Sequence, residues 1–211
     1  SLVAAAILGF TLVGWLGYQG WQHAQLRQHQ ATTFVALAAD SPARPAGTTL
    51  LDLEETAWSF DAQPEDHGSY VESAQELAAR FGVSLRYAEP GEDTECTFDG
   101  GSDAVTVAWV CIHEPGVVRL NPGADVMPRH LYEPGLIDTV KHELAHLVIY
   151  ERCGTSRLSF ASDPEGITNS YARFYLGAEE AELVLSAEAD PAYTMTPATD
   201  DAAFAIHAGS C

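Results

Sequence analysis

The chain has 211 residues, of which 46% are hydrophobic, so it has enough apolar side chains to build one folded domain of modest size. Its 30 acidic residues outnumber the 10 basic ones and give a formal net charge of −20. Such a surface repels phosphate backbones and anionic lipid headgroups, so nucleic acid is not an expected partner.

The first stretch of the chain, 1–18, contains no charged residue. About 18 to 20 apolar residues are enough for a helix to cross a bilayer. Trp15, Tyr18 and Trp21 lie near the end of the run, as in an aromatic belt at a membrane surface. A cleaved signal peptide is the alternative, but the run is long for one and no small-residue cleavage site follows it. We therefore expect a transmembrane signal anchor over 1–21, in a single-pass membrane protein with an extracytoplasmic C-terminal domain.

The residues that follow, 22–47, are expected to form a stalk and a linker, because they are rich in Gln, His and Ala and then in Pro and Gly. The folded domain is expected over 48–211. Its first part, 50–67, is acidic and has no clear periodicity. An amphipathic helix is predicted over 70–81, with Ser69 before it as a cap.

The middle of the chain has the composition of β-strands. Residues 83–87 alternate between apolar and polar side chains, 105–112 are almost all apolar, and 117–120 follow a tight Pro-Gly connection. Because a helix and a group of strands are followed by a second half with helical patterns, the order of elements predicts an α+β fold.

Residues 142–146 read H-E-L-A-H and match the pattern H-E-x-x-H. In a helix, the two imidazoles lie on the same face and can bind one Zn²⁺. Glu143 lies about 100° around the helix, beside the metal, where a general base for water belongs. The helix should begin near Pro134 and end before Gly154. Its core side is predicted from the apolar residues Leu136, Val140, Leu144, Leu147 and Val148.

A second helix is expected next, with Asp163 as its N-cap, Pro164 as its first residue and Glu165 in its first turn. Eighteen residues separate His146 from Glu165. The alternative is that the Glu165 carboxylate stabilises the helix by its favourable interaction with the positive N-terminal end of the helix dipole. Over 117–176 the chain resembles the gluzincin group of zinc metallopeptidases, in which a glutamate on the next helix follows H-E-x-x-H.

The resemblance implies one Zn²⁺ held by His142, His146 and Glu165. It also implies a minimal zincin-like domain, in which a small mixed or antiparallel sheet packs on the active-site helix and the glutamate helix. Asn169 comes one turn after Glu165, where the thermolysin group carries an acidic residue that orients a ligand histidine. We therefore expect Asn169 to lie behind a ligand histidine.

Two further expectations follow from the resemblance. In this group the strand nearest the cleft holds a peptide substrate along its free edge, and residues 117–120 are our candidate for that strand. Zinc peptidases also use a hydrogen-bond donor for the oxyanion. The candidates are Tyr171, Tyr175, Tyr193 and His207, and the sequence leaves the choice between them open.

The chain has four cysteines, Cys96, Cys111, Cys153 and Cys211, and no C-x-x-C pattern of a cysteine zinc site. An even number of cysteines in an exported domain indicates two disulfides. Three pairings are possible. We expect nearest neighbours to pair, as Cys96–Cys111 and Cys153–Cys211, so that the last residue is tied to the end of the H-E-x-x-H helix.

Together these observations predict a membrane-anchored zinc peptidase that hydrolyses peptide bonds with an activated water and Glu143 as the general base. Its expected partners are a peptide or protein substrate and the membrane. The alternative is a catalytically inactive zincin-like domain that serves as a structural or protein-binding module. The presence of Glu143 favours the enzyme, because a purely structural metal site needs no carboxylate at that position.

Overall fold

A computed structural model describes residues 2–38, 43–89, 92, 106–111, 114–155, 163–183 and 190–211. These residues form helices and one three-stranded sheet, which confirms the α+β class. The helices are α1 (Leu2–Gln30), α2 (Leu50–Trp58), α3 (Val71–Arg80), α4 (Gly135–Cys153), α5 (Pro164–Leu176) and α7 (Pro197–His207), with 3-10 helices η1 (Arg129–Tyr132) and η2 (Pro191–Tyr193). The strands are β1 (Ser84–Tyr87), β2 (Ala108–Cys111) and β3 (Glu114–Leu120).

The sheet is mixed and has the strand order β1-β3-β2. β1 runs parallel to β3, whereas β2 runs antiparallel to it. Because β3 has a partner on both sides, the prediction that 117–120 form a free edge is wrong. Val118 and Leu120 are apolar because they lie completely buried in the central strand. Among the described strands, β2 is the edge strand that packs against α4.

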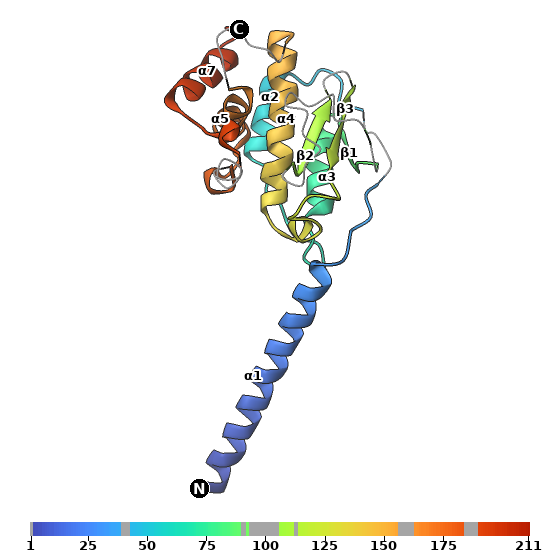
Figure 1. Cartoon of the computed structure of the whole chain (residues 1–211), viewed down its shortest axis with the longest axis vertical. Helices are drawn as coiled ribbons and strands as arrows, with labels where there is room; N and C mark the ends of the chain where they lie inside the picture. The colour runs from blue at the N-terminus through green and yellow to red at the C-terminus, as the bar shows by residue number, and fades with distance from the viewer. Residues whose placement is uncertain are drawn as a thin grey trace.

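Helix α4 lies between the sheet and a second group of helices (Figure 1). The sheet and α3 pack on one side of it, and α5 and α7 pack on the other, with α2 against α5. The predicted core residues Leu136, Val140 and Leu144 are fully buried between these layers. The helix follows Pro134 and ends at Gly154, whose positive φ of 65° suits a residue without a side chain. Both predicted ends of this helix are confirmed.

The acidic stretch after residue 48 contains a helix, α2, that its weak periodicity did not predict. Thr49 and Asp52 form a capping box at its start, in which each side chain bonds the other residue's backbone N–H. Only Leu53 and Ala57, one turn apart, bury an apolar face. A helix of this length shows too few apolar repeats to be recognised by spacing, and packing against α5 stabilises it.

Helix α1 extends away from the rest of the chain (Figure 1). Its side chains are described from Trp15 onward, and from Gln19 to Gln30 they include five glutamines, two histidines and Arg27. Among the described residues, no helix combines the length and the apolar character needed to cross a bilayer. This finding overturns the predicted transmembrane anchor over 1–21 and the single-pass localisation that was based on it.

A buried polar cluster joins the last turns of α4 and α7 to the middle of α2 and of α5. The Arg152 guanidinium donates through Nη2 to Glu54 Oε1 (2.8 Å) and through Nε to the Tyr171 hydroxyl (2.8 Å). Its Nη1 donates to the His207 carbonyl (3.2 Å), and the Tyr171 hydroxyl donates to Glu54. Because Glu54 is buried and paired with Arg152, loss of one partner would leave an uncompensated charge inside the helical layer.

The predicted disulfide between Cys153 and Cys211 is confirmed. It links the last turn of α4 to the last residue of the chain, 58 positions later. The second predicted pair, Cys96–Cys111, lies outside the described residues because Cys96 does.

Candidate metal centre

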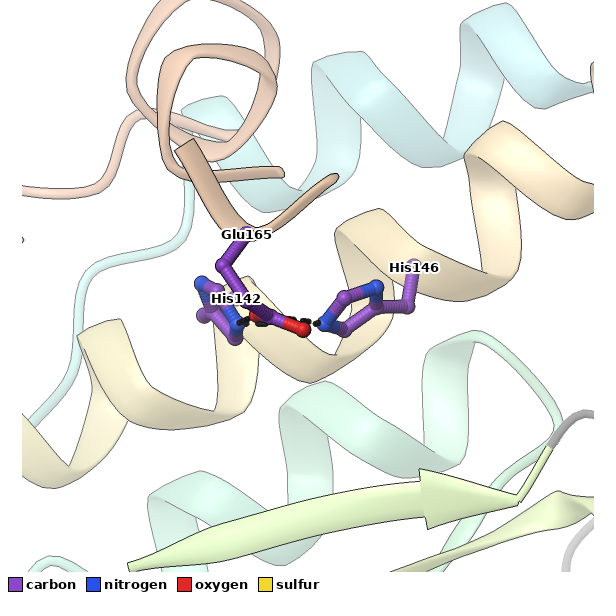
Figure 2. Close-up of side chains that lie close together, drawn as sticks. All are labelled: His142, His146 and Glu165. Carbon is purple, nitrogen blue, oxygen red and sulfur yellow. Dashed lines mark hydrogen bonds and ion pairs between the residues drawn. The ribbon is translucent and has the colours of Figure 1, made fainter. Parts of the chain in front are cut away.

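The candidate site lies where α4 packs against the first turn of α5. His142 and His146 are one turn apart on α4 and point toward the start of α5, where Glu165 is the second residue (Figure 2). Pro164 occupies the first position of α5, as predicted. Asp163 is at the N-cap position, but its side chain makes no capping hydrogen bond.

The three side chains meet in a nearly equilateral triangle of ligand atoms. Glu165 Oε2 lies 3.0 Å from His142 Nε2 and 3.2 Å from His146 Nε2, and the two Nε2 atoms are 3.1 Å apart. Around a tetrahedral ion with bonds of about 2.0–2.1 Å, ligand atoms are separated by about 3.3 Å. The observed spacing therefore fits a single metal ion bound by all three residues.

Hydrogen bonds on the far side of each ring determine which nitrogen faces the centre. Thr168 Oγ1 donates its proton to the Pro164 carbonyl (2.9 Å), so it must accept a hydrogen bond from His146 Nδ1 (3.2 Å). Asn169 Nδ2 faces the Tyr193 carbonyl, an acceptor, at 2.7 Å, so Asn169 Oδ1 accepts from His142 Nδ1 (2.7 Å).

Both imidazoles therefore use Nδ1 in hydrogen bonds away from the centre and direct Nε2 toward Glu165. Two ring nitrogens and one carboxylate oxygen then converge on one point, which is the arrangement of a cation site. Burial by itself raises the pKa of Glu165, but the adjacent imidazoles outweigh burial and hold that pKa below its usual range. Glu165 is thus a carboxylate and can act as a ligand. The donor set of this structure fits a divalent metal ion.

Glu143 lies on the sheet side of this triangle and is buried. Burial raises the pKa of Glu143 to about 7, and the nearby Glu165 carboxylate adds to the rise, against the effect of His142. The Val110 backbone in β2 hydrogen-bonds to the Glu143 carboxylate. The predicted base therefore lies between the metal ligands and the edge strand of the sheet.

The structure also separates the four candidate oxyanion donors. Tyr171, Tyr175 and His207 gather around Glu54, with the Tyr175 ring stacked on His207 at 3.8 Å. Tyr193 instead lies against a ligand, with its ring centroid 5.5 Å from that of His142. Only Tyr193, among these four, contacts a residue of the site.

Two contributors to the site had no clear signal in the sequence. Thr168 follows Glu165 by three residues and so shares its helix face, but threonine at such a position is ordinarily a helix surface residue. Val110 reaches Glu143 only because β2 forms the edge of the sheet next to α4. Neither contact could be predicted from spacing alone.

Comparisons with known proteins returned no match among protein-family models, curated proteins or solved structures.

Proposed function

We propose that the chain is a zinc-dependent peptidase of the gluzincin type. The observation that carries this proposal is the convergence of His142 Nε2, His146 Nε2 and the Glu165 carboxylate beside a fourth, buried residue, Glu143. A metal-binding triad alone suits a structural site as well as a catalytic one. A carboxylate with a raised pKa next to three ligands suits proton transfer.

Zinc is the metal that these ligands favour. Two neutral imidazoles and one carboxylate are borderline donors typical of Zn²⁺, whereas Ca²⁺ and Mg²⁺ prefer sites made of oxygen atoms alone. Three protein ligands are the number found in catalytic zinc sites, which keep one position for water or substrate. When bound here, Zn²⁺ would supply Lewis acidity, which makes water a stronger nucleophile and polarises a substrate carbonyl.

Glu143 would move the proton. Its buried carboxylate could accept a proton from the attacking water and return it to the leaving amine. The hydrogen bond from the Val110 backbone limits the orientations that the carboxylate can adopt. Proton transfer requires this orientation, because the carboxylate oxygen must lie within hydrogen-bond reach of the water.

The substrate would bind along the edge of β2. An extended peptide can add to a free strand edge through main-chain hydrogen bonds, and β2 is the edge strand next to α4. A peptide on this edge would pass Glu143, which already contacts Val110. Tyr193 is then our candidate for the donor that stabilises the oxyanion, because its ring lies against His142.

The substitution Glu143→Gln tests this function. Glutamine keeps the size of the side chain and can still accept a hydrogen bond, but it cannot take up a proton. We expect the variant to retain one zinc per chain and to lose at least about 100-fold in cleavage rate, the lower end of what general acid–base catalysis contributes. Zinc content is measured by elemental analysis, and cleavage by mass spectrometry of a peptide library.

Glu151→Gln is the matched control, because Glu151 lies on the same helix with its side chain half exposed and paired with Arg44. This control should cleave at the wild-type rate. Equal cleavage by wild type and Glu143→Gln would contradict the mechanism. A wild-type chain that binds zinc but cleaves no peptide of the library would support the non-catalytic binding module instead.

A further inference from the structure

Asn169 links the candidate metal centre by hydrogen bonds to a segment that is distant in sequence. It is completely buried, and both ends of its side-chain amide are used. Oδ1 accepts the Nδ1 proton of His142 at 2.7 Å, and Nδ2 donates to the carbonyl of Tyr193 at 2.7 Å. A continuous line of two hydrogen bonds therefore runs from the Tyr193 backbone to a metal ligand. Each bond polarises the next, so the two are stronger together than apart.

The 190–196 segment, which contains η2, packs closely on α5 around this line. A Cβ atom on Gly166 would lie 2.5 Å from the Thr194 carbonyl oxygen, so this approach requires glycine. The Tyr193 ring lies beside the His142 imidazole at the same place. The segment thus contacts the site at three neighbouring points, a backbone approach at Gly166, a hydrogen bond at Asn169 and a ring contact at His142.

An aspartate could replace only half of this arrangement. Its carboxylate would accept the His142 Nδ1 proton, but it has no donor for the Tyr193 carbonyl and would place negative charge against that oxygen. The amide at position 169 therefore does what a carboxylate cannot, because it orients the ligand and holds the segment at once.

We propose that Asn169 is a positioning residue that couples metal binding to the ordering of the 190–196 segment. A metal ion bound to His142 Nε2 fixes that ring, the ring fixes the Asn169 amide, and the amide fixes the Tyr193 carbonyl. By linkage, an ordered segment must strengthen metal binding by the same factor. This inference rests on the metal-binding part of the proposed function and does not depend on peptide hydrolysis.

The test measures two quantities in the full chain, zinc affinity by competition with a chromogenic chelator and backbone hydrogen exchange over 190–196 with and without zinc. In the wild type, zinc should slow exchange in the segment by at least about fivefold, the low end of coupling between two sites. Asn169→Ala should lose about 10–100-fold in zinc affinity, the usual cost of removing a residue that orients a ligand. Circular dichroism checks that each variant is folded.

Asn169→Asp separates the two roles. It should recover zinc affinity to within about threefold of wild type, because the acceptor for His142 is restored. The effect of zinc on exchange in the segment should nevertheless disappear, because the donor to Tyr193 is missing. Ser170→Ala is the control. Ser170 is also buried, but it bonds Thr199 and Asp200 of α7, so this variant should keep the zinc-dependent difference.

The coupling is refuted if Asn169→Asp shows the wild-type zinc effect on exchange, or if Asn169→Ala binds zinc as tightly as wild type. Peptide cleavage without any zinc effect on the segment would refute the coupling and leave the proposed function intact. Zinc-dependent protection of the segment in a chain that cleaves no peptide would support the coupling and contradict the proposed peptidase function. A wild-type chain that binds no zinc would refute both.

Discussion

At the scale of single residues, the candidate metal centre depends on its third residue, Glu165. Glu165 comes from a different helix than the two histidines, and its Oε2 atom lies within 3.2 Å of both Nε2 atoms. Without this carboxylate, only the two imidazoles on α4 would remain, and none of the ligand groups would carry a negative charge. The identity of Glu165 therefore decides whether the histidine pair is a metal centre.

Loss of a residue that orients a ligand usually reduces metal affinity by about 10–100-fold. We expect Glu165→Ala to reduce zinc affinity by more than this, because the substitution removes a ligand itself. Chelator competition and zinc content measure this loss. Asp163→Ala is the matched control at the start of the same helix. Asp163 is at the N-cap position and is not one of the three converging ligand residues, so the control should keep its zinc. Loss of zinc from Asp163→Ala but not from Glu165→Ala would contradict the ligand assignment.

At the scale of secondary-structure elements, α4 is attached to the chain that follows α5 by buried charged groups. Asp138 Oδ1 accepts the Glu179 backbone N–H at 2.9 Å, and Lys141 Nζ donates to the Gly177 carbonyl at 2.7 Å. Burial raises the pKa of Asp138 to about 6, against the effects of the Glu179 hydrogen bond and Lys141, while Glu182 and Glu179 add to the rise. This contact holds α4 in place one turn before His142.

The raised pKa predicts how stability changes with pH. The folded chain binds the Asp138 proton more tightly than the unfolded chain, whose pKa is near 3.8. The resulting stabilisation is therefore fully present below about pH 4 and is lost as the pH rises through about 6. A rise of this size corresponds to about 3 kcal/mol.

Asp138→Asn keeps an acceptor for Glu179 and removes the charge. We therefore expect this variant to gain stability relative to wild type as the pH rises from 4 to 7, by up to about 3 kcal/mol. Urea unfolding at several pH values measures the difference. The exposed control Asp201→Asn should follow the wild-type pH profile. Parallel profiles for Asp138→Asn and wild type would show that the buried carboxyl does not titrate as expected.

At the scale of the whole molecule, four helices are held together at a distance from the candidate metal centre. The Cys153–Cys211 disulfide closes the chain from the end of α4 to its last residue, and the Arg152–Glu54 pair lies next to it. Cys153 is seven residues beyond His146, about 10 Å along the helix. The disulfide therefore stabilises the fold without touching the ligands.

We expect the double substitution Cys153→Ser/Cys211→Ser to lower the free energy of unfolding by about 4 kcal/mol, because the disulfide restricts the unfolded chain over a separation of 58 residues. Urea unfolding without reductant measures this change. Zinc content at 25 °C should stay at one per chain, since Arg152 and the packing of α7 remain. A stability equal to wild type, or a loss of zinc in the folded variant, would contradict this view of the disulfide.

The sequence by itself determined the parts of the site that depend on neighbouring residues. Four-residue spacing places His142 and His146 on one helix face, and Gly154 and Pro164 mark where helices end and begin. These features follow from backbone geometry over a few residues, which is unchanged by the rest of the fold. The position of Asn169 behind His142 was expected from the resemblance to the thermolysin group, and the hydrogen bond between the two side chains agrees with it.

Only the tertiary structure decided which distant segments meet. β2 rather than β3 is the edge strand next to Glu143, because partners in a sheet are chosen by packing between segments and not by the composition of one strand. The Tyr193 ring lies beside His142 because the 190–196 segment approaches Asn169, 24 positions earlier. Contacts at such separations depend on the balance of burial and chain entropy over the whole molecule, which no local pattern records.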